Sequence, residues 1–383
     1  MTTPLVTERT PLRASLVVLS LVATVAAAQA PGAQEFNTQK GRVRVVTVAT
    51  GLDHPWGLAF LPDGRMIVTE RPGHVRIVAP NGELGPRLAG VPEVWARGQG
   101  GMLDVTVSPD FATSRVIYLS YAEPGDGGAG TAVARARLGD GRLEDVRVVF
   151  RQVPKRTTGQ HFGSRVVVAR DGTLFITTGD RGGRDDAQDL SKHMGKVIHV
   201  RPDGSVPPDN PFVGRNGAQP EIWSYGHRNM QGATLHPETG QLWTVEHGAQ
   251  GGDEVNTPQA GRNYGWPVIT YGVDYSGARI GEGTAKEGME QPVHYWDPSI
   301  APSGMTFYTG DKFPGWRGNL FVGSLKFALV ARLELDGTRV RSEERILEGF
   351  GDRVRDVVQG PDGYIYLITD MDAGRIVRIE PVR

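Results

Sequence analysis

The sequence predicts an all-β protein, a six-bladed β-propeller built from four-stranded antiparallel blades. Its 52 glycines and 26 prolines in 383 residues indicate many turns and short strands rather than long helices. A turn followed by a short β-branched or aromatic run recurs six times along the chain. A β-sandwich or several small β domains are the alternatives. Nothing resembling a linker interrupts the repeats, which favours the propeller.

Each copy of the repeat begins with a turn rich in Pro, Asp or Gly, because glycine tolerates the positive φ of a tight hairpin. The strands expected after these turns cover residues 66–69, 116–120, 174–177, 242–245, 320–323 and 364–368. Second strands are expected at 74–78, 196–200, 329–335 and 375–379. The alternating segment 42–49 is expected to pair with the C-terminal blade and close the ring through its N- and C-terminal strands, since propellers protect their edges.

The start of the chain has the pattern of an export signal. Residues 1–30 contain a basic start, an apolar stretch and an Ala-Gln-Ala cleavage site, and an uncleaved membrane anchor is the alternative. We expect a linker over 31–41, the propeller over 42–383, a periplasmic or secreted location and no stable membrane insertion. The chain has no cysteine, and its net charge of −1 provides no basic field for nucleic acid.

A histidine and an aspartate flank one predicted strand hairpin. His161 precedes a strand, and Asp180 lies in a Gly-Asp-Arg-Gly turn at the end of the next one. Histidine changes its protonation near neutral pH and is the commonest general base. A carboxylate within reach holds the imidazole in one tautomer and stabilises its protonated form. We predict a catalytic pair here; a structural loop histidine is the alternative.

Two Gly-rich segments carry further polar clusters. Arg228 and Asn229 are adjacent and suit a carboxylate or an oxygen that gains charge, although Arg228 can equally bond the carbonyls at the blade end. Between 246 and 254, acidic residues stand among glycines whose carbonyls are free to point at a cation. Such hard oxygen ligands are typical of calcium sites, and equally of a turn whose polar groups satisfy one another.

Three cationic side chains lie near strand ends in the last third of the chain. Lys326 follows a predicted strand, and Arg353 and Arg355 point the same way because they are two residues apart on an extended segment. Together they can neutralise a polyanionic ligand; ion pairs with the neighbouring aspartates are the alternative. Gln99 lies in a tight Gly-rich segment that a ligand can approach.

Taken in order, these segments resemble the soluble pyrroloquinoline-quinone (PQQ) sugar dehydrogenases, and more closely their aldose sugar dehydrogenase branch than the soluble glucose dehydrogenases. The most specific strings are Gly-Leu-x-x-Pro-Trp-Gly-Leu-Ala-Phe-Leu-Pro-Asp-Gly at 51–64, His-Arg-Asn-x-Gln-Gly at 227–232 and Asn-Tyr-Gly-Trp-Pro at 263–267. The resemblance extends from Val43 to Ile379. It implies a six-bladed propeller with PQQ on its top face, held through Ca²⁺, that oxidises the anomeric carbon of aldoses to the lactone.

The resemblance also implies individual roles. His161 matches the base that takes the proton of the anomeric hydroxyl, and Arg228 matches the residue beside the reactive carbonyl. The residues that match PQQ contacts are Gln99, Arg228, Asn229, Tyr275, Lys326, Arg353 and Arg355. Those that match calcium ligands are Gly248 and Ala249, through their carbonyls, and Glu254 and Tyr264 at a further site. The implied partners are an aldose substrate and an external electron acceptor (quinone, dye or cytochrome), with the protein a monomer or homodimer.

The sequence departs from the glucose dehydrogenases at three positions. His247, Ala249 and Gln160 stand where those enzymes have Gln, Pro and Asp, and the loops around 271–290 are short. These differences indicate a wider sugar site. Two other functions fit the fold: a calcium-dependent lactone or ester hydrolase, which needs acidic or Asn ligands converging on the central channel, and a non-catalytic propeller that binds a carbohydrate or partner.

Overall fold

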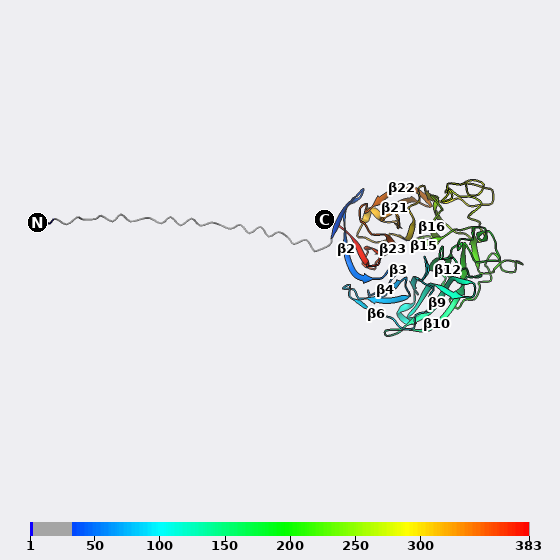
Figure 1. Ribbon diagram of the computed structural model, residues 1–383, viewed down its shortest axis with the longest axis horizontal. Helices are drawn as coiled ribbons and strands as arrows, with labels where there is room; N and C mark the ends of the chain where they lie inside the picture. Colours follow the sequence, from blue (N-terminus) through cyan, green and yellow to red (C-terminus); the bar gives the residue numbers. More distant parts are fainter. Residues whose placement is uncertain (3–32, 383) are drawn as a thin grey trace. The chain divides into compact units, whose positions relative to one another are not determined.

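A computed structural model describes residues 1–2 and 33–382. Residues 33–382 form six antiparallel sheets arranged in a ring (Figure 1). The first strands of successive sheets contact one another in a closed series: β3 (Pro55–Phe60), β7 (Met102–Val107), β11 (Gly163–Val168), β15 (Met230–Leu235), β19 (Pro302–Phe307), β23 (Val354–Gln359) and again β3. The predicted six-bladed propeller is confirmed.

The remaining strands complete the blades in chain order, and most of them match the predicted ranges. Blades one to three add β4 (Met66–Glu70), β5 (His74–Val78) and β6 (Leu84–Arg87); β8 (Val116–Gly125), β9 (Gly128–Leu138) and β10 (Leu143–Arg151); and β12 (Leu174–Thr178), β13 (Lys196–Val200) and β14 (Ile222–Tyr225). Blades four to six add β16 (Leu242–Glu246), β17 (Asp253–Asn256) and β18 (His294–Trp296); β20 (Leu320–Ser324), β21 (Leu329–Asp336) and β22 (Arg339–Ile346); and β24 (Ile365–Thr369) and β25 (Gly374–Pro381).

Helices are few and short in the described part of the chain. They are α1 (Phe111–Ser114) and the 3-10 helices η1 (Arg184–Ala187) and η2 (Pro314–Trp316). No helix there is long and apolar enough to cross a membrane.

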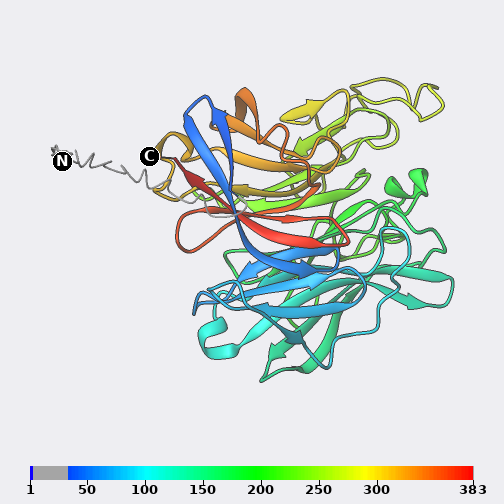
Figure 2. The same cartoon turned by 60° about the vertical axis from the view of Figure 1, so that its left-hand side comes forward.

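The last blade closes the ring with strands from the start of the chain. β2 (Gly41–Leu52) pairs with β25, with Val45 opposite Ile379, and Figure 2 shows the blue strand beside the red one. The structure corrects the linker predicted over 31–41, because β1 (Gln34–Thr38) pairs with β2 and makes this blade five-stranded. β1 supplies partners for backbone groups that the edge of β2 would otherwise expose. The predicted signal peptide, apart from Met1 and Thr2, lies outside the described residues.

The hydrophobic core is divided among the six contacts between neighbouring blades. Each contact has its own cluster of buried apolar side chains. Between blades four and five, for example, Trp243 and Phe307 meet edge to face with ring centroids 5.4 Å apart. Since every blade buries both faces against its neighbours, the end of the ring is left to carry polar residues.

Polar side chains meet on the propeller axis. The third residue of each first strand lies there: Gly57, Asp104, Arg165, Gly232, Gly304 and Asp356. Arg165, in the third blade, pairs with Asp104 at 2.8 Å and with Asp356, in the opposite blade, at 2.9 Å. All three side chains are buried. Glycine at positions such as 57 and 304 leaves room for the two aspartates that pair with Arg165.

Gly304→Ala tests how tightly the axis is packed. A Cβ at Gly304 would lie 1.8 Å from Oδ1 of Asp356, so the carboxylate must move away from Arg165. We expect the free energy of unfolding to fall by about 1–3 kcal/mol, as overpacking of a close-packed site does. Chemical denaturation measures it. Gly283→Ala is the matched control, because its Cβ would meet only the end of Arg279 at 3.6 Å; equal losses in the two variants would contradict the interpretation.

Candidate active site

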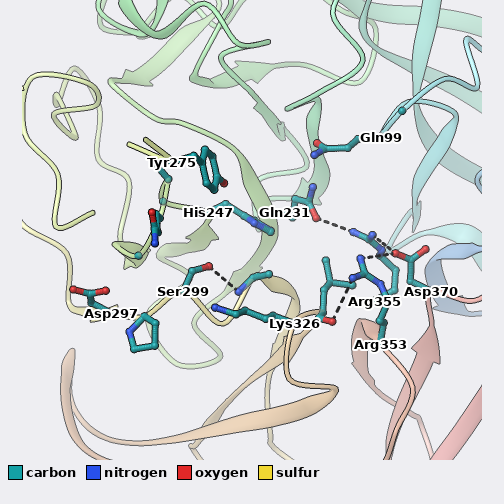
Figure 3. A pocket seen from close by; sticks show the side chains of 18 of the residues that line it. Gln99, Gln231, His247, Tyr275, Asp297, Ser299, Lys326, Arg353, Arg355 and Asp370 are labelled. Atoms are coloured by element: carbon teal, nitrogen blue, oxygen red, sulfur yellow. Dashed lines mark hydrogen bonds and ion pairs between the residues drawn. The ribbon is translucent and has the colours of Figure 1, made fainter. Parts of the chain in front are cut away.

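Antiparallel strands bring two kinds of segment to the same end of the ring. The residues just before each first strand and those just after each second strand meet there, and a cleft of about 870 Å³ opens among them (Figure 3). Predicted site residues that line this cleft are Gln99, Gly248, Ala249, Tyr275, Lys326, Arg353 and Arg355. His161, Arg228 and Asn229 are not among its lining residues, but they adjoin it through hydrogen bonds.

The predicted pair of His161 and Asp180 is formed. Nδ1 of His161 lies 2.7 Å from Oδ1 of Asp180, and the second oxygen of Asp180 accepts a hydrogen bond from Nε1 of Trp266 at 2.9 Å. The backbone N–H of Gly182 donates to Oδ1 as well. Asp180 is buried. Nδ1 of His161 is thereby engaged by a fixed carboxylate, which leaves Nε2 as the nitrogen available for proton transfer.

The backbone holds His161 in an uncommon conformation. Its φ is +55°, and its N–H donates to Oε1 of Gln99 at 2.8 Å. Gly179 passes so close that a Cβ there would lie 1.9 Å from the carbonyl oxygen of His161. A non-glycine residue with positive φ persists only where its surroundings enforce that conformation.

The protonation of this pair is set by burial and by nearby charges. Burial lowers the pKa of His161 below its ordinary value; the hydrogen bond to Asp180 opposes that shift, and the charge of Arg228 adds to it. Burial alone would raise the pKa of Asp180, but the hydrogen bond with His161 and the charge of Arg228 bring it below the ordinary value. The pair therefore consists of a neutral imidazole and a carboxylate at neutral pH.

Arg228 and Asn229 lie beside the cleft. The backbone carbonyl of Arg228 accepts from the N–H of Asp180 at 2.8 Å, and its guanidinium donates to the carbonyl of His247 and lies 5.2 Å from the ring centre of Trp266. The predicted alternative, bonding of a carbonyl at the blade end, is thus realised for one nitrogen of Arg228. Asn229 is buried and accepts from the N–H of Gly163, so its side-chain oxygen has a structural partner.

Lys326, Arg353 and Arg355 gather on one side of the cleft near Asp370 (Figure 3). Both arginines pair with Asp370, at 3.2 and 2.6 Å. The predicted alternative of pairing with adjacent aspartates is wrong, because Asp352 pairs with Arg375 and Asp356 with Arg165. Three cations facing one carboxylate leave an excess of positive charge on this wall.

The predicted calcium residues line two adjoining spaces, the cleft and a smaller cavity. Gly248 lines both the cleft and a smaller cavity that also contains Glu246, Glu254 and Tyr264. Nδ2 of Asn256 donates to both glutamates at 3.1 Å. Burial and the neighbouring Glu246 raise the pKa of Glu254 to about 8. The hydroxyl of Tyr264 already donates to the carbonyl of Thr257, so only its carbonyl remains for a cation.

Sequence reasoning missed several lining residues. Arg71, Trp56 and Gln231 line the cleft. Asp370 lines it too and is the carboxylate that pairs with the two arginines of the cationic wall. A signal existed for two of them: Arg71 and Asp370 directly follow the second strands of their blades, as His247 does in blade four. Trp56 and Gln231 are the second residues of their first strands, and Arg355 occupies the same position.

A base paired with a buried carboxylate, beside a polar cleft with a cationic wall, defines an enzyme site for a small polar molecule. Residues 52–378 match the sequence profile of the family described as Glucose / Sorbosone dehydrogenase. The chain belongs to this family.

Relatives support the assignment over nearly the whole chain. Aldose sugar dehydrogenase YliI of Escherichia coli (strain K12) is 50% identical over 345 residues, which is 88% of this chain and 93% of that protein. The crystal structure of the apo form of the soluble aldose sugar dehydrogenase of E. coli has 50% identity and a TM-score of 0.87, covering 89% of this chain and 100% of that one. The PQQ-bound form of the aldose sugar dehydrogenase of Streptomyces coelicolor has 29% identity and a TM-score of 0.74, covering 88% and 98%.

Asp180→Asn tests the electrostatic part of the pair. Because the hydrogen bond and charge of Asp180 oppose the effect of burial, removing the charge lowers the pKa of His161 further. Titration of the histidine ring signals by NMR measures this, with His161→Ala used to assign the resonance. A pKa of His161 that is unchanged or higher in Asp180→Asn would contradict the interpretation.

Proposed function

We propose that the protein oxidises the anomeric carbon of aldose sugars to the lactone, with PQQ as its resident cofactor and Ca²⁺ as the ion that holds it. The observation that carries this proposal is the pair of His161 and Asp180 beside a cleft that has a cationic wall. The names of the relatives agree with it, since they are aldose sugar dehydrogenases and one of them binds PQQ.

The residues present fit a tricarboxylate such as PQQ. Lys326, Arg353 and Arg355 supply positive charge, and the described carboxylates that line the cleft are those of Asp370, which pairs with both arginines, and Asp297. Among the described residues, Nε of Arg355 and Nε2 of His247 are buried nitrogens without a hydrogen-bond partner. Buried polar groups left unpaired are costly, so such nitrogens favour a polar ligand. The proposed cofactor contacts are therefore Gln99, His247, Tyr275, Lys326, Arg353 and Arg355.

The calcium proposal rests on oxygen chemistry. Glu254 is partly buried beside the buried Glu246 at the small cavity, and like charges in such a place are stabilised by a cation. We propose that Glu254 and the carbonyl of Tyr264 would hold one ion, and that the carbonyls of Gly248 and Ala249 would hold a second. A bound calcium would supply Lewis acidity next to Arg228.

The chain's own residues handle the proton. When bound, the quinone supplies the acceptor for the hydride that leaves the sugar carbon. His161 accepts the proton of the anomeric hydroxyl at Nε2, and Asp180 stabilises the imidazolium that results. Arg228 provides a fixed positive charge where an oxygen gains negative charge. The proton and the hydride leave the same H–C–O–H unit, which gives the lactone.

The residues on the propeller axis argue against the hydrolase alternative. Such an enzyme needs free oxygen ligands converging on the central channel, whereas Asp104 and Asp356 both pair with Arg165. A cation bound there would compete with the guanidinium.

Export and electron transfer complete the proposal. The signal pattern of residues 1–30 supports a periplasmic or secreted location. Each turnover leaves two electrons in the protein, so an external acceptor such as a quinone, dye or cytochrome must remove them.

Reconstitution tests the proposed function directly. Purified apo-protein is assayed for dye reduction with D-glucose and other aldoses, with PQQ and Ca²⁺ added separately and together. We expect turnover only when both are present. If neither turnover nor a change in the PQQ absorbance appears, the proposal fails, and lactone hydrolysis with Ca²⁺ is assayed next.

His161→Ala separates binding from proton transfer. We expect PQQ to bind as in the wild type while kcat falls about 10²–10⁴-fold, the usual contribution of a general base. In the wild type burial holds the pKa of His161 below its ordinary value, so the neutral imidazole predominates at pH 7 and kcat/KM falls only as the pH drops through that lowered pKa. Wild-type turnover by the variant would remove His161 from the role of base.

A further inference from the structure

Arg181 is a fully buried cation one residue beyond Asp180. Its guanidinium donates to the backbone carbonyls of Gln160 and Thr158, the latter at 2.6 Å, and lies 3.4 Å from the ring centre of Phe162. The carbonyls of Ala129 and Arg156 lie 3.4 and 3.5 Å away, so all its acceptors are backbone oxygens. Burying a charge among neutral dipoles is expensive, and a merely stabilising role would be better served by an apolar side chain.

Apart from the carbonyl of Ala129 in β9, the groups that Arg181 contacts belong to or lie close in sequence to the segment that ends in His161. Gln160 and Thr158 directly precede the histidine, and Phe162 follows it. The contact is reciprocal, because Oγ1 of Thr158 donates to the carbonyl of Arg181 at 2.6 Å. Both His161 and Arg181 have positive φ, +55° and +53°. The guanidinium therefore bridges two strained segments, one carrying the histidine and the other carrying its carboxylate partner.

We propose that Arg181 is a positioning residue, which fixes the segment 158–161 so that His161 meets Asp180 and keeps Nε2 available. This inference rests on the proposed role of His161 as the base. The planar fork of arginine bonds two carbonyls at fixed angles, which an ammonium cannot do. Misplacing a reacting group by about 1 Å can cost about 10²-fold in rate.

The charge of Arg181 also acts on the histidine. The charged or titratable groups that influence His161 are Asp180, Arg228, Arg181 and His247. Arg181 and Arg228 disfavour its protonation, whereas Asp180 favours it. Removing the guanidinium therefore has two opposing effects: loss of its charge raises the pKa of His161, whereas a weaker hydrogen bond to Asp180, which has the larger influence, lowers that pKa.

The test compares Arg181→Met and Arg181→Lys with Arg170→Met. Arg170 is a matched control: its guanidinium also donates to a backbone carbonyl, that of Pro237, but it lies on an exposed turn away from the cleft. Two readouts use the apo-protein: hydrogen exchange of the peptide spanning 157–163, whose His161 N–H donates to Gln99, and NMR titration of His161. A third uses the enzyme reconstituted with PQQ and Ca²⁺, from which kcat and KM for the sugar are measured separately.

In Arg181→Met we expect faster exchange at 157–163, a pKa of His161 that differs from that of the wild type and a kcat lower by about 10- to 100-fold with little change in KM. Arg181→Lys should recover part of kcat, and it also serves if the Met variant does not fold. Wild-type exchange and titration in both folded variants would overturn the proposal. Turnover is not needed for that decision, so a wild type that oxidises no sugar with PQQ would defeat the proposed function while the apo-protein readouts still decide the role of Arg181.

Discussion

Arg165 carries a positive charge to the propeller axis, where it lies between carboxylates from two other blades. Asp104 and Asp356 both pair with it, and burial raises the pKa of Asp104 to about 6. Removing one partner of a buried ion network typically costs about 3–5 kcal/mol, because the remaining charge is left unpaired. Blades three and six are opposite each other in the ring. This network therefore joins two blades across the axis, whereas the hydrophobic clusters join neighbouring blades.

The same guanidinium reaches the floor of the cleft. It lies 4.4 Å from the ring centre of Trp56, and its Nε donates to the carbonyl of Gln231 at 2.7 Å. The side chain of Gln231 in turn accepts from Arg355 at 2.7 Å. Two hydrogen bonds, both made by Gln231, therefore connect the axis to the cationic wall and anchor that wall to the centre of the fold.

Local patterns predicted the blades well because each hairpin is specified by its own turn and its own alternation. His161 and Asp180 were also predictable, since they flank one hairpin. Contacts between distant segments were not: Trp266 reaches Asp180 across 86 residues, and Arg353 and Arg355 pair with Asp370 instead of their neighbours. The strand β1 escaped prediction because four of its five residues, Gln-Glu-Phe-Asn-Thr, are polar. Their place in the sheet follows from the free edge of β2 rather than from their own alternation.

Three of the nine non-glycine residues with positive φ in the described part of the chain belong to the hairpin that carries the proposed catalytic pair. His161, Ser164 and Arg181 all have positive φ, and each such non-glycine residue costs roughly 1–3 kcal/mol. Hydrogen bonds hold the strained residues: the carbonyl of Ser164 accepts from Ser120 at 2.5 Å, and His161 is held by Gln99 and Asp180. Apolar contacts between blades are insensitive to such local geometry, because they depend on area rather than direction. The fold therefore tolerates backbone strain at His161, because its stability comes from the apolar contacts between blades, which that strain does not alter.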